Sequence, residues 1–232
     1  GKLIASKGVD LLLAAWPLVQ QRVPDARLLV VGFGAFRAGL EELAAALGRG
    51  DLEVARALRA EDGRALPELA AFLDGLTGEA AAAYREAAAA VAQHVHWAGR
   101  LEHAELEDVL PAADAMVVPS TFPEAFGMVA AEAAACGAFP VVANHSGLAE
   151  VARSLAAGMP AAARPWLTFH VGPRAVPELA DALASWLTAP AALRAATREA
   201  IVGVARARYS WEGVARTVIA AAQGRLDGLP HP

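Results

Sequence analysis

The sequence predicts an α/β protein built on a Rossmann-like, mostly parallel sheet with helices on both faces. The first observation is a set of short apolar runs, each bounded by Gly, Pro or Ser, as is typical of strands buried on both faces. They lie at 26–32, 95–98, 114–120, 139–143 and 167–171. The second observation is that helical patterns separate these runs, at 9–22, 37–48, 103–112, 127–136, 147–156 and 177–188. Strand–helix alternation of this kind favours right-handed βαβ units, and therefore a parallel sheet.

Two regions fall outside this simple alternation. Helical stretches at 190–208 and 211–223 close the chain after the last strand. Residues 50–93 form a long helical insertion with turn signals at Gly63 and at 75–78. We interpret it as a surface helical hairpin, with a lid or a subunit contact as the alternative; the side chains it is expected to bury are Leu66, Leu69, Phe72 and Leu73. Pro17, inside the first helical pattern, is expected to kink that helix or to shift its start.

Charge and composition exclude several classes of protein. The formal net charge of −5 provides no electrostatic footprint for nucleic acid, whose binders are basic on at least one face. No uncharged apolar run approaches the ~18 residues needed to span a bilayer, and no secretory leader opens the sequence. The single cysteine, Cys136, cannot form an internal disulfide or a cysteine-based metal site. We expect a cytoplasmic protein without a transmembrane segment and, because Gly1 opens on loop-like residues, a piece of a longer one.

A glycine-rich turn follows the first apolar run, with the sequence GFGAFR at 32–37. Gly32 and Gly34 match a dinucleotide-binding fingerprint, but Arg37 stands at the third glycine position and no suitable acidic residue follows a second strand. We interpret these glycines as serving the tight turn from strand to helix.

The most informative stretch is STFPEAFGMVAAEAAACG, residues 120–137. A helix is expected to open near Gly127, so that the backbone N–H groups of Phe126, Gly127 and Met128 form a ready anion site. Glu124 lies in the loop beside this site, and Glu132 lies in the second helical turn, on the same side as Met128. A buried glutamate there needs hydrogen-bond donors, which either a ribose diol or an arginine elsewhere in the fold would supply.

A second candidate is the opening stretch, GKLIASKG, in which Lys2 and Lys7 flank a loop expected at the carboxyl end of a strand that ends at Gly1. Open α/β sheets bind ligands at that end, and two lysines there could neutralise a diphosphate without a metal. The alternative is that the pair is ordinary solvated surface.

Other chemistry-bearing residues give weaker signals. His94 and His96 lack a third metal ligand even with His103 nearby, and nothing pairs His145 or His170 with a partner at a useful spacing. The tryptophans are expected to be core or helix-packing residues; they are Trp16, Trp97, Trp166, Trp186 and Trp211.

Taken in order, several segments resemble glycosyltransferase family 4 (group 1), and in particular its C-terminal, donor-binding half. They are GKLIASKGVDLLLAAW, PDARLLVVGFG, GRLEHAELEDVLPAADAMVVPS, PEAFGMVAAEAAACGAFPVVANHSGLAEV and YSWEGVARTVI. The insertion at 50–93 and a stretch near 154–168 lie outside the resemblance. Two details depart from the family's pattern: TFPEAFG is slightly longer than the common loop, and HSGLAE has one glycine where two are usual.

The resemblance implies a role for each candidate residue. The E-x7-E motif formed by Glu124 and Glu132 would place the first glutamate on the donor sugar and the second on the ribose hydroxyls. Lys2 and Lys7 would grip the diphosphate, although the first position is more often arginine. The backbone segment Phe126–Met128 would face phosphate and sugar, and Gly99 and Arg100 would lie near the base. Glu124, Lys2 and Lys7 are therefore the expected catalytic residues.

The same resemblance implies a retaining, metal-independent enzyme of the two-domain GT-B architecture, with a nucleotide-diphosphate sugar as donor and no cofactor. Residues 1–232 would be its nucleotide-sugar-binding Rossmann-like domain, with the acceptor domain absent. The strand that should end at Gly1 is also expected to be absent, which would leave a gap in the centre of the sheet. The alternatives are a non-catalytic nucleotide-sugar-binding module, or another enzyme of this architecture such as an epimerase or phosphorylase.

Overall fold

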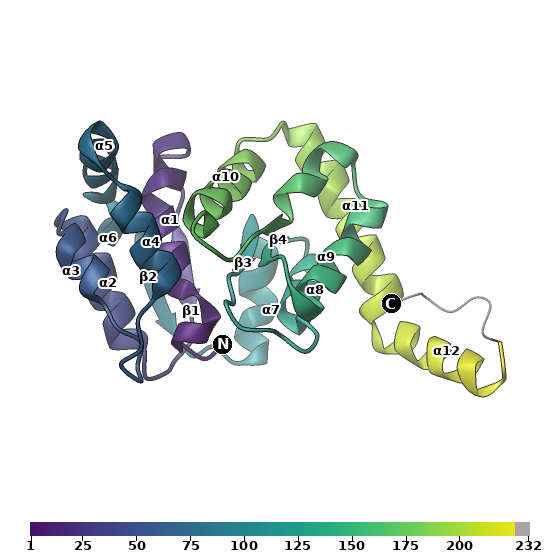
Figure 1. Ribbon diagram of the computed structural model, residues 1–232. Helices are drawn as coiled ribbons and strands as arrows, with labels where there is room; N and C mark the ends of the chain where they lie inside the picture. Colours follow the sequence, from purple (N-terminus) through teal and green to yellow (C-terminus); the bar gives the residue numbers. More distant parts are fainter. Residues whose placement is uncertain (226–232) are drawn as a thin grey trace.

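The computed structural model describes residues 1–225 and shows parallel strands flanked by helices (Figure 1). The strands are β1 (Leu28–Val31), β2 (Val95–Gly99), β3 (Ala115–Val118), β4 (Phe139–Ala143) and β5 (Thr168–Phe169). The helices between and after them are α1 (Val9–Arg22), α2 (Arg37–Gly48), α7 (His103–Ala112), α8 (Met128–Ala135), α9 (Ser146–Gly158), α10 (Ala175–Leu187), α11 (Ala191–Tyr209) and α12 (Trp211–Ala222). The predicted α/β class is confirmed, and the observed elements follow the predicted ranges closely.

The strands form two sheets rather than one continuous sheet. β1 pairs with β2, and β4 lies between β3 and β5; every pairing is parallel. Leu28 pairs with Val95 in the smaller sheet, and Ala115 pairs with Phe139 in the larger one. Within the described part of the chain β1 and β3 are not hydrogen-bonded to each other. The carboxyl ends of both lie close to the first residues of the chain.

A shared core holds the two sheets together. α1 packs along α10 and also against α2 and α5, and its Leu11 and Leu13 side chains are fully buried. α8 and α9 pack against β4, and α11 covers both of them. The rings of Phe139 in β4 and Trp186 in α10 stack at 4.2 Å between centroids. Because α1 contacts helices belonging to both sheets, it fixes their relative position.

The insertion folds as four short helices, not as the expected hairpin, on the left of Figure 1. They are α3 (Leu52–Ala57), α4 (Pro67–Gly75), α5 (Gly78–Ala88) and α6 (Val91–His94). The four side chains expected to be buried are buried: Leu66, Leu69, Phe72 and Leu73. Tyr84 explains much of the difference, because its ring meets Phe72 edge-on and its hydroxyl donates to the Ala14 carbonyl at 2.8 Å. That buried bond ties α5 to α1 and makes the insertion part of the core.

Two expectations about single residues are corrected in part: Pro17 does not shift the start of its helix, and Trp211 is not a core residue. α1 begins at Val9 and continues through Pro17 to Arg22, so the proline does not shift its start. Pro17 is buried among apolar neighbours, and packing of this kind outweighs one lost helical hydrogen bond. Trp211 is 90% exposed at the start of α12, which projects from the rest of the molecule (Figure 1), so it is not a core residue. The other four tryptophans are buried or pack against the core.

Candidate active site at the carboxyl ends of the strands

The opening loop lies directly against the loop that follows β3. A short 3-10 turn, η1 (Ala5–Lys7), ends at Gly8, whose φ of 65° is left-handed. A Cβ atom at Gly8 would lie only 2.0 Å from the Pro119 carbonyl oxygen, so only glycine fits this approach. The Thr121 N–H donates to the Ser6 carbonyl at 2.9 Å. These contacts join the amino-terminal loop to the end of β3.

That junction brings Lys7 to Glu124, although the two residues are 117 positions apart. The Lys7 ammonium and the Glu124 carboxylate form an ion pair at the carboxyl ends of the strands. The Ser120 hydroxyl donates to the same carboxylate oxygen, Oε1, at 2.6 Å. Partial burial works to raise the pKa of Glu124, but the hydrogen bonds from Lys7 and Ser120 and the Lys7 charge outweigh it and hold that pKa below its ordinary value. Glu124 is therefore ionised at neutral pH.

A second layer of hydrogen bonds fixes the loop that carries Glu124. The Glu124 backbone N–H donates to the Ser146 hydroxyl oxygen at 2.9 Å, and that hydroxyl lies 3.0 Å from His145 Nδ1. His145 Nε2 lies 2.8 Å from the Ser120 carbonyl oxygen, to which it must donate. Nδ1 of the neutral ring then accepts from Ser146. No local pattern predicts this arrangement, because His145 and Ser146 are separated from Ser120 by more than twenty positions.

The turn at 145–147 explains why HSGLAE has one glycine where the family usually has two. Ser146 has a φ of 49°, a left-handed conformation that glycine adopts at less cost. A serine there keeps the turn and adds the hydroxyl that binds Glu124 and His145. Gly147 cannot change in the same way, because its Cβ would lie 2.5 Å from the Phe126 Cα atom. Its N–H donates to the Glu124 carbonyl at 3.0 Å.

The start of α8 lies next to this loop. Gly127 is its N-cap with a φ of 86°, and a Cβ there would lie 2.9 Å from a Leu148 methyl group. The close packing against Leu148 therefore favours glycine at position 127, in addition to the expected approach of a ligand. No side chain caps the helix, and Met128 is exposed. The Phe126 ring meets Tyr209 of α11 edge-on at 5.7 Å, so only its backbone faces the expected anion site.

Glu132 is exposed, whereas the alanine-rich sequence around it indicated a buried glutamate. α8 buries Ala130, Ala131, Ala133 and Ala134, and leaves Met128 and Glu132 on one open face. No arginine pairs with Glu132 within residues 1–225, so the structural alternative finds no support there. The carboxylate is accessible on the side of the helix that begins beside Glu124.

The remaining predicted residues gather at the ends of β1 and β2. Lys2 forms a parallel bridge with Phe33, and the Arg100 guanidinium lies over the Phe33 ring at 5.6 Å. Gly99, with a φ of 74°, ends β2, and its carbonyl accepts from the Gly32 N–H at 2.7 Å. Lys2, Phe33 and Arg100 are all exposed. Sequence reasoning did not single out Phe33 as part of this group.

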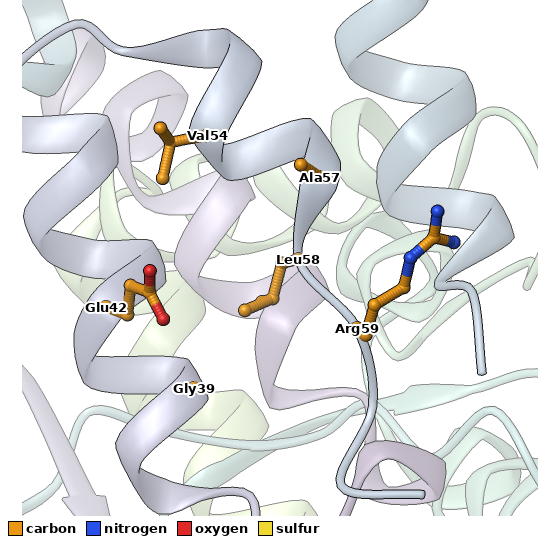
Figure 2. A pocket seen from close by; sticks show the side chains of 6 residues that line it. All are labelled: Gly39, Glu42, Val54, Ala57, Leu58 and Arg59. Carbon is orange, nitrogen blue, oxygen red and sulfur yellow. The ribbon is translucent and has the colours of Figure 1, made fainter. Parts of the chain in front are cut away.

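The insertion also reaches the opening loop. Glu61 accepts a hydrogen bond from the Ala5 N–H at 2.9 Å and so caps η1 from another part of the chain. Beside this contact a hollow of about 370 Å³ opens between α2 and α3 (Figure 2). It is lined by Gly39, Glu42, Val54, Ala57, Leu58 and Arg59. None of the predicted site residues lines it, and the Arg59 side chain points away from it, so we do not assign it to the site.

Two further structural tests concern metals and membranes. Among residues 1–225, no group of three or more His, Cys, Asp or Glu side chains is placed to hold a metal ion. In the same part of the chain, no helix combines the length and the apolar character that crossing a membrane requires.

The fold is that of a Rossmann-like domain, and the Lys7–Glu124 ion pair lies at the carboxyl ends of its strands, where open α/β sheets bind ligands. Residues 52–202 match the family described as glycosyl transferases group 1. The chain is 32% identical over 230 residues to a D-inositol 3-phosphate glycosyltransferase of Segniliparus rotundus, covering 98% of this chain and 39% of that protein. It is 34% identical over 145 residues to a glycogen synthase of Mycobacterium tuberculosis, covering 61% of this chain and 32% of that protein.

A third relative is a GDP-mannose-dependent monoacylated alpha-(1-6)-phosphatidylinositol monomannoside mannosyltransferase of Corynebacterium glutamicum. It is 28% identical over 220 residues, which cover 91% of this chain and 42% of that protein. The chain belongs to the group 1 glycosyltransferase family. It spans 39% of the length of the Segniliparus rotundus relative and 42% of the length of the Corynebacterium glutamicum relative, about two fifths in each case.

Proposed function

We propose that this chain is the donor-binding half of a retaining, metal-independent glycosyltransferase of the GT-B architecture. The protein would move a sugar from a nucleoside diphosphate to an acceptor held by a second domain. The observation that carries the proposal is the contact between Lys7 and Glu124 at the carboxyl ends of the strands, where open α/β sheets bind ligands. The coverage of the relatives supports a second domain outside these residues.

Each residue has a role that its surroundings support. Lys2 and Lys7 would neutralise the diphosphate, together with the free N–H groups at the start of α8, beginning at Met128. Glu124 would accept hydrogen bonds from the sugar hydroxyls, because Lys7 and Ser120 already hold its carboxylate ionised and in place. Glu132, exposed and unpaired within residues 1–225, would accept from the ribose diol.

Gly99 and Arg100 would lie beside the base. Arg100 is exposed and Gly99 is half-buried at the end of β2, which would leave room for a planar ligand there.

Leaving-group stabilisation is the chemistry that these residues supply. As the glycosidic bond to the diphosphate breaks, negative charge builds on the departing phosphate oxygens. Lys2, Lys7 and the α8 backbone would face that charge, and preorganised charges of this kind are usually the largest single contribution to catalysis. A pair of lysines can do this without a metal.

Binding of nucleoside diphosphates tests the site. In titration calorimetry with UDP, GDP and ADP, we expect one of the three to bind the chain. Glu132→Gln should then weaken binding by about 1–3 kcal/mol, because charge-assisted bonds to the ribose are lost while the shape is kept. Glu199→Gln, an exposed glutamate of α11, is the matched control and should change nothing. Equal affinities for the parent chain and Glu132→Gln would remove Glu132 from the site.

Transfer itself needs both reactants at near-attack distance, and positioning of that kind supplies about 7–11 kcal/mol of barrier reduction. The 232-residue chain should therefore bind donor weakly and transfer sugar at no measurable rate in assays with labelled donors and acceptors. Robust turnover by this chain would place the acceptor site within it and contradict the two-domain proposal. A non-catalytic binding module predicts that the longer protein is inactive as well, whereas an epimerase or phosphorylase predicts conversion without sugar transfer.

A further inference from the structure

The segment between α3 and α4 of the insertion forms a tight hairpin. Arg59 and Ala65 pair in an antiparallel bridge. The Ala60 N–H donates to the Arg64 carbonyl at 2.9 Å, and Gly63, with a φ of 82°, takes the left-handed position of the turn. Ala60 is buried, whereas the residues that follow it are exposed. The hairpin is therefore anchored in the core and presents its tip on the surface.

The tip carries three charges, two of which pair with each other. Asp62 accepts from the Arg64 backbone N–H at 3.1 Å and from the Arg64 guanidinium at 2.6 Å. Glu61 forms no ion pair within residues 1–225, and its Oε2 atom accepts from the Ala5 N–H at 2.9 Å. Ala5 lies 56 positions earlier in the chain, so this bond joins the insertion to the opening loop.

The start of η1 needs an acceptor that its own sequence does not supply. Its N-cap residue, Ile4, has an apolar side chain, and no acidic residue lies in its first turn. Ala5 is buried, and a buried N–H without a partner costs stability. Glu61 supplies the missing acceptor from the insertion.

Glu61 holds one end of η1, and the end of β3 holds the other. The Gly8 N–H donates to the Ala5 carbonyl at 2.9 Å, which closes the turn around Lys7. Because η1 has only three residues, a shift of Ala5 displaces Lys7 as well. The ammonium that pairs with Glu124 is therefore held in place from two sides, and one of these is the insertion.

We propose that Glu61 is a positioning residue of the site: acting through η1, it holds Lys7 where the ammonium pairs with Glu124 and receives the diphosphate of the donor. The role of Lys7 toward the diphosphate rests on the proposed function, whereas the contact between Glu61 and Ala5 does not. The inference gives a function to the hairpin of the insertion, which the alternation of strands and helices does not require.

A diphosphate and a monophosphate of the same nucleoside separate this role from a purely structural one. For the nucleoside diphosphate that binds the parent chain, we expect calorimetry to show about 5-fold weaker binding to Glu61→Ala, the effect of one lost hydrogen bond. The matching monophosphate carries less charge and should lose less. Glu61→Gln keeps a side-chain oxygen that accepts from Ala5, so it should bind both nucleotides as the parent does.

Glu86→Ala is the matched control. It removes an exposed glutamate of α5 whose side chain forms no hydrogen bond within residues 1–225, and it should change neither affinity. Equal losses for the two nucleotides in Glu61→Ala, or no loss for either, would overturn the proposal. Tighter diphosphate binding by both Glu61 variants would also overturn it, because Glu61 would then act only as a negative charge near the lysines.

The pKa of Glu124 tests the same inference without any nucleotide. Partial burial works to raise this pKa, but the hydrogen bonds from Lys7 and Ser120 and the Lys7 charge hold it below its ordinary value. Glu61→Ala should therefore raise the pKa of Glu124 in an NMR titration of the side-chain carboxyl carbons, whereas Glu61→Gln and Glu86→Ala should leave it unchanged.

The direction of this change distinguishes positioning from simple electrostatics. Loss of a negative charge near Glu124 would by itself lower the pKa of Glu124, because a nearby like charge disfavours the ionised form. An unchanged or lowered pKa in Glu61→Ala would therefore overturn the proposal. A raised pKa in Glu61→Ala, combined with a parent chain that binds no nucleoside diphosphate, would support the positioning of Lys7 by Glu61 and contradict the proposed function alone.

Discussion

The two ends of the candidate site are built differently. At the end of β3, Glu124 is held by Lys7, Ser120 and the Ser146 hydroxyl, and none of these groups is fully exposed. At the ends of β1 and β2, Lys2 and Arg100 are exposed around an exposed phenylalanine, and the ion pair of Arg100 with Glu102 is itself on the surface. A side chain that is already fixed loses little conformational entropy when a ligand binds, whereas a free one loses more. The comparison teaches that the end proposed to face the sugar is preorganised, whereas the end proposed to face the base would have to order on binding.

The largest expected effect comes from a substitution at Gly8, where the opening loop contacts the end of β3. Gly8→Ala should destabilise the protein by about 4 kcal/mol, the range reached by backbone clashes and strained dihedral angles. The added Cβ would lie 2.0 Å from the Pro119 carbonyl, at a φ of 65° that disfavours any side chain. The opening loop must then move away from the end of β3, and Lys7 moves with it. Urea unfolding followed by circular dichroism measures the loss.

A matched substitution separates this clash from the general effect of a methyl group. Gly203 lies in α11 with nothing within 4 Å of its Cβ position. Gly203→Ala should therefore stabilise the protein, by about 0.5–1 kcal/mol, because alanine favours a helix. If Gly8→Ala were as harmless, the contact between the opening loop and β3 would not be needed to form the site.

The second effect concerns the helix that supports both ends. Asp10, in the first turn of α1, is buried, and burial, with Glu68 of α4 nearby, raises its pKa from 3.8 to about 7. Because the folded protein then binds more protons than the unfolded chain between those values, this group costs stability as pH rises from about 4 to 7. The cost levels off above pH 7. Asp10→Asn removes the titration, so its stability should not decline over that range.

The expected loss of stability between about pH 4 and pH 7 is about 2–4 kcal/mol, since a shift of one pKa unit corresponds to about 1.4 kcal/mol. Urea unfolding at pH 4, 5.5, 7 and 8.5 measures it for both proteins. Parallel stability profiles for the parent and Asp10→Asn would show that Asp10 keeps an ordinary pKa, and that α1 supports the site without a buried acid.

The fold was largely predictable because its signals are local. Short apolar runs and helical patterns each depend on residues close in sequence, and they located all five strands to within two or three residues. The insertion was harder, because its four helices are fixed by distant contacts such as that from Tyr84 to Ala14. The bounds of α1 agree with the predicted range 9–22, because burial of Pro17 outweighs the local rule that a proline inside a helix shifts its start.

The residues of the candidate site could be named from the sequence, but the contacts between them could not. The resemblance named Lys7 and Glu124, but their contact depends on Gly8 and Pro119, which bring two loops together. In the sequence, Ser146 stands only as a serine where a glycine is usual, which does not predict the hydrogen bonds of its hydroxyl. The exposure of Glu132 was not predicted, because the alanines around it indicate packing and only the fold shows which face of α8 is covered.

A smaller effect tests the second layer of the preorganised end. Ser146→Ala keeps the left-handed strain at a φ of 49° and removes the hydroxyl, so it should cost about 1 kcal/mol, the value of one hydrogen bond. Ser146→Gly also removes the hydroxyl but relieves the strain, so it should be the more stable of the two. Thermal unfolding of both variants measures the difference. If Ser146→Ala were instead the more stable of the two, the backbone at this position would not be strained. If Ser146→Ala were as stable as the parent protein, the hydroxyl would make no useful bond.

The smallest effect on stability, and the sharpest test of the comparison, uses the two lysines. Lys2 is exposed and forms no ion pair within residues 1–225, so Lys2→Met should change stability by less than about 0.5 kcal/mol, as surface substitutions do.

Lys7→Met removes the cation beside Glu124 and should cost about 1 kcal/mol at neutral pH, because a partly exposed pair contributes no more. The hydrogen bond and charge of Lys7 help to depress the pKa of Glu124, so their contribution is present above the ordinary carboxyl pKa and is lost as pH falls through the folded value. The difference between Lys7→Met and the parent should therefore shrink in acid, while Lys2→Met stays close to the parent at every pH. Both variants should nevertheless weaken diphosphate binding in calorimetry, since each removes one positive charge from the site. If Lys2→Met binds as well as the parent, the base-facing end contributes no charge to the diphosphate, and the preorganised end holds it alone.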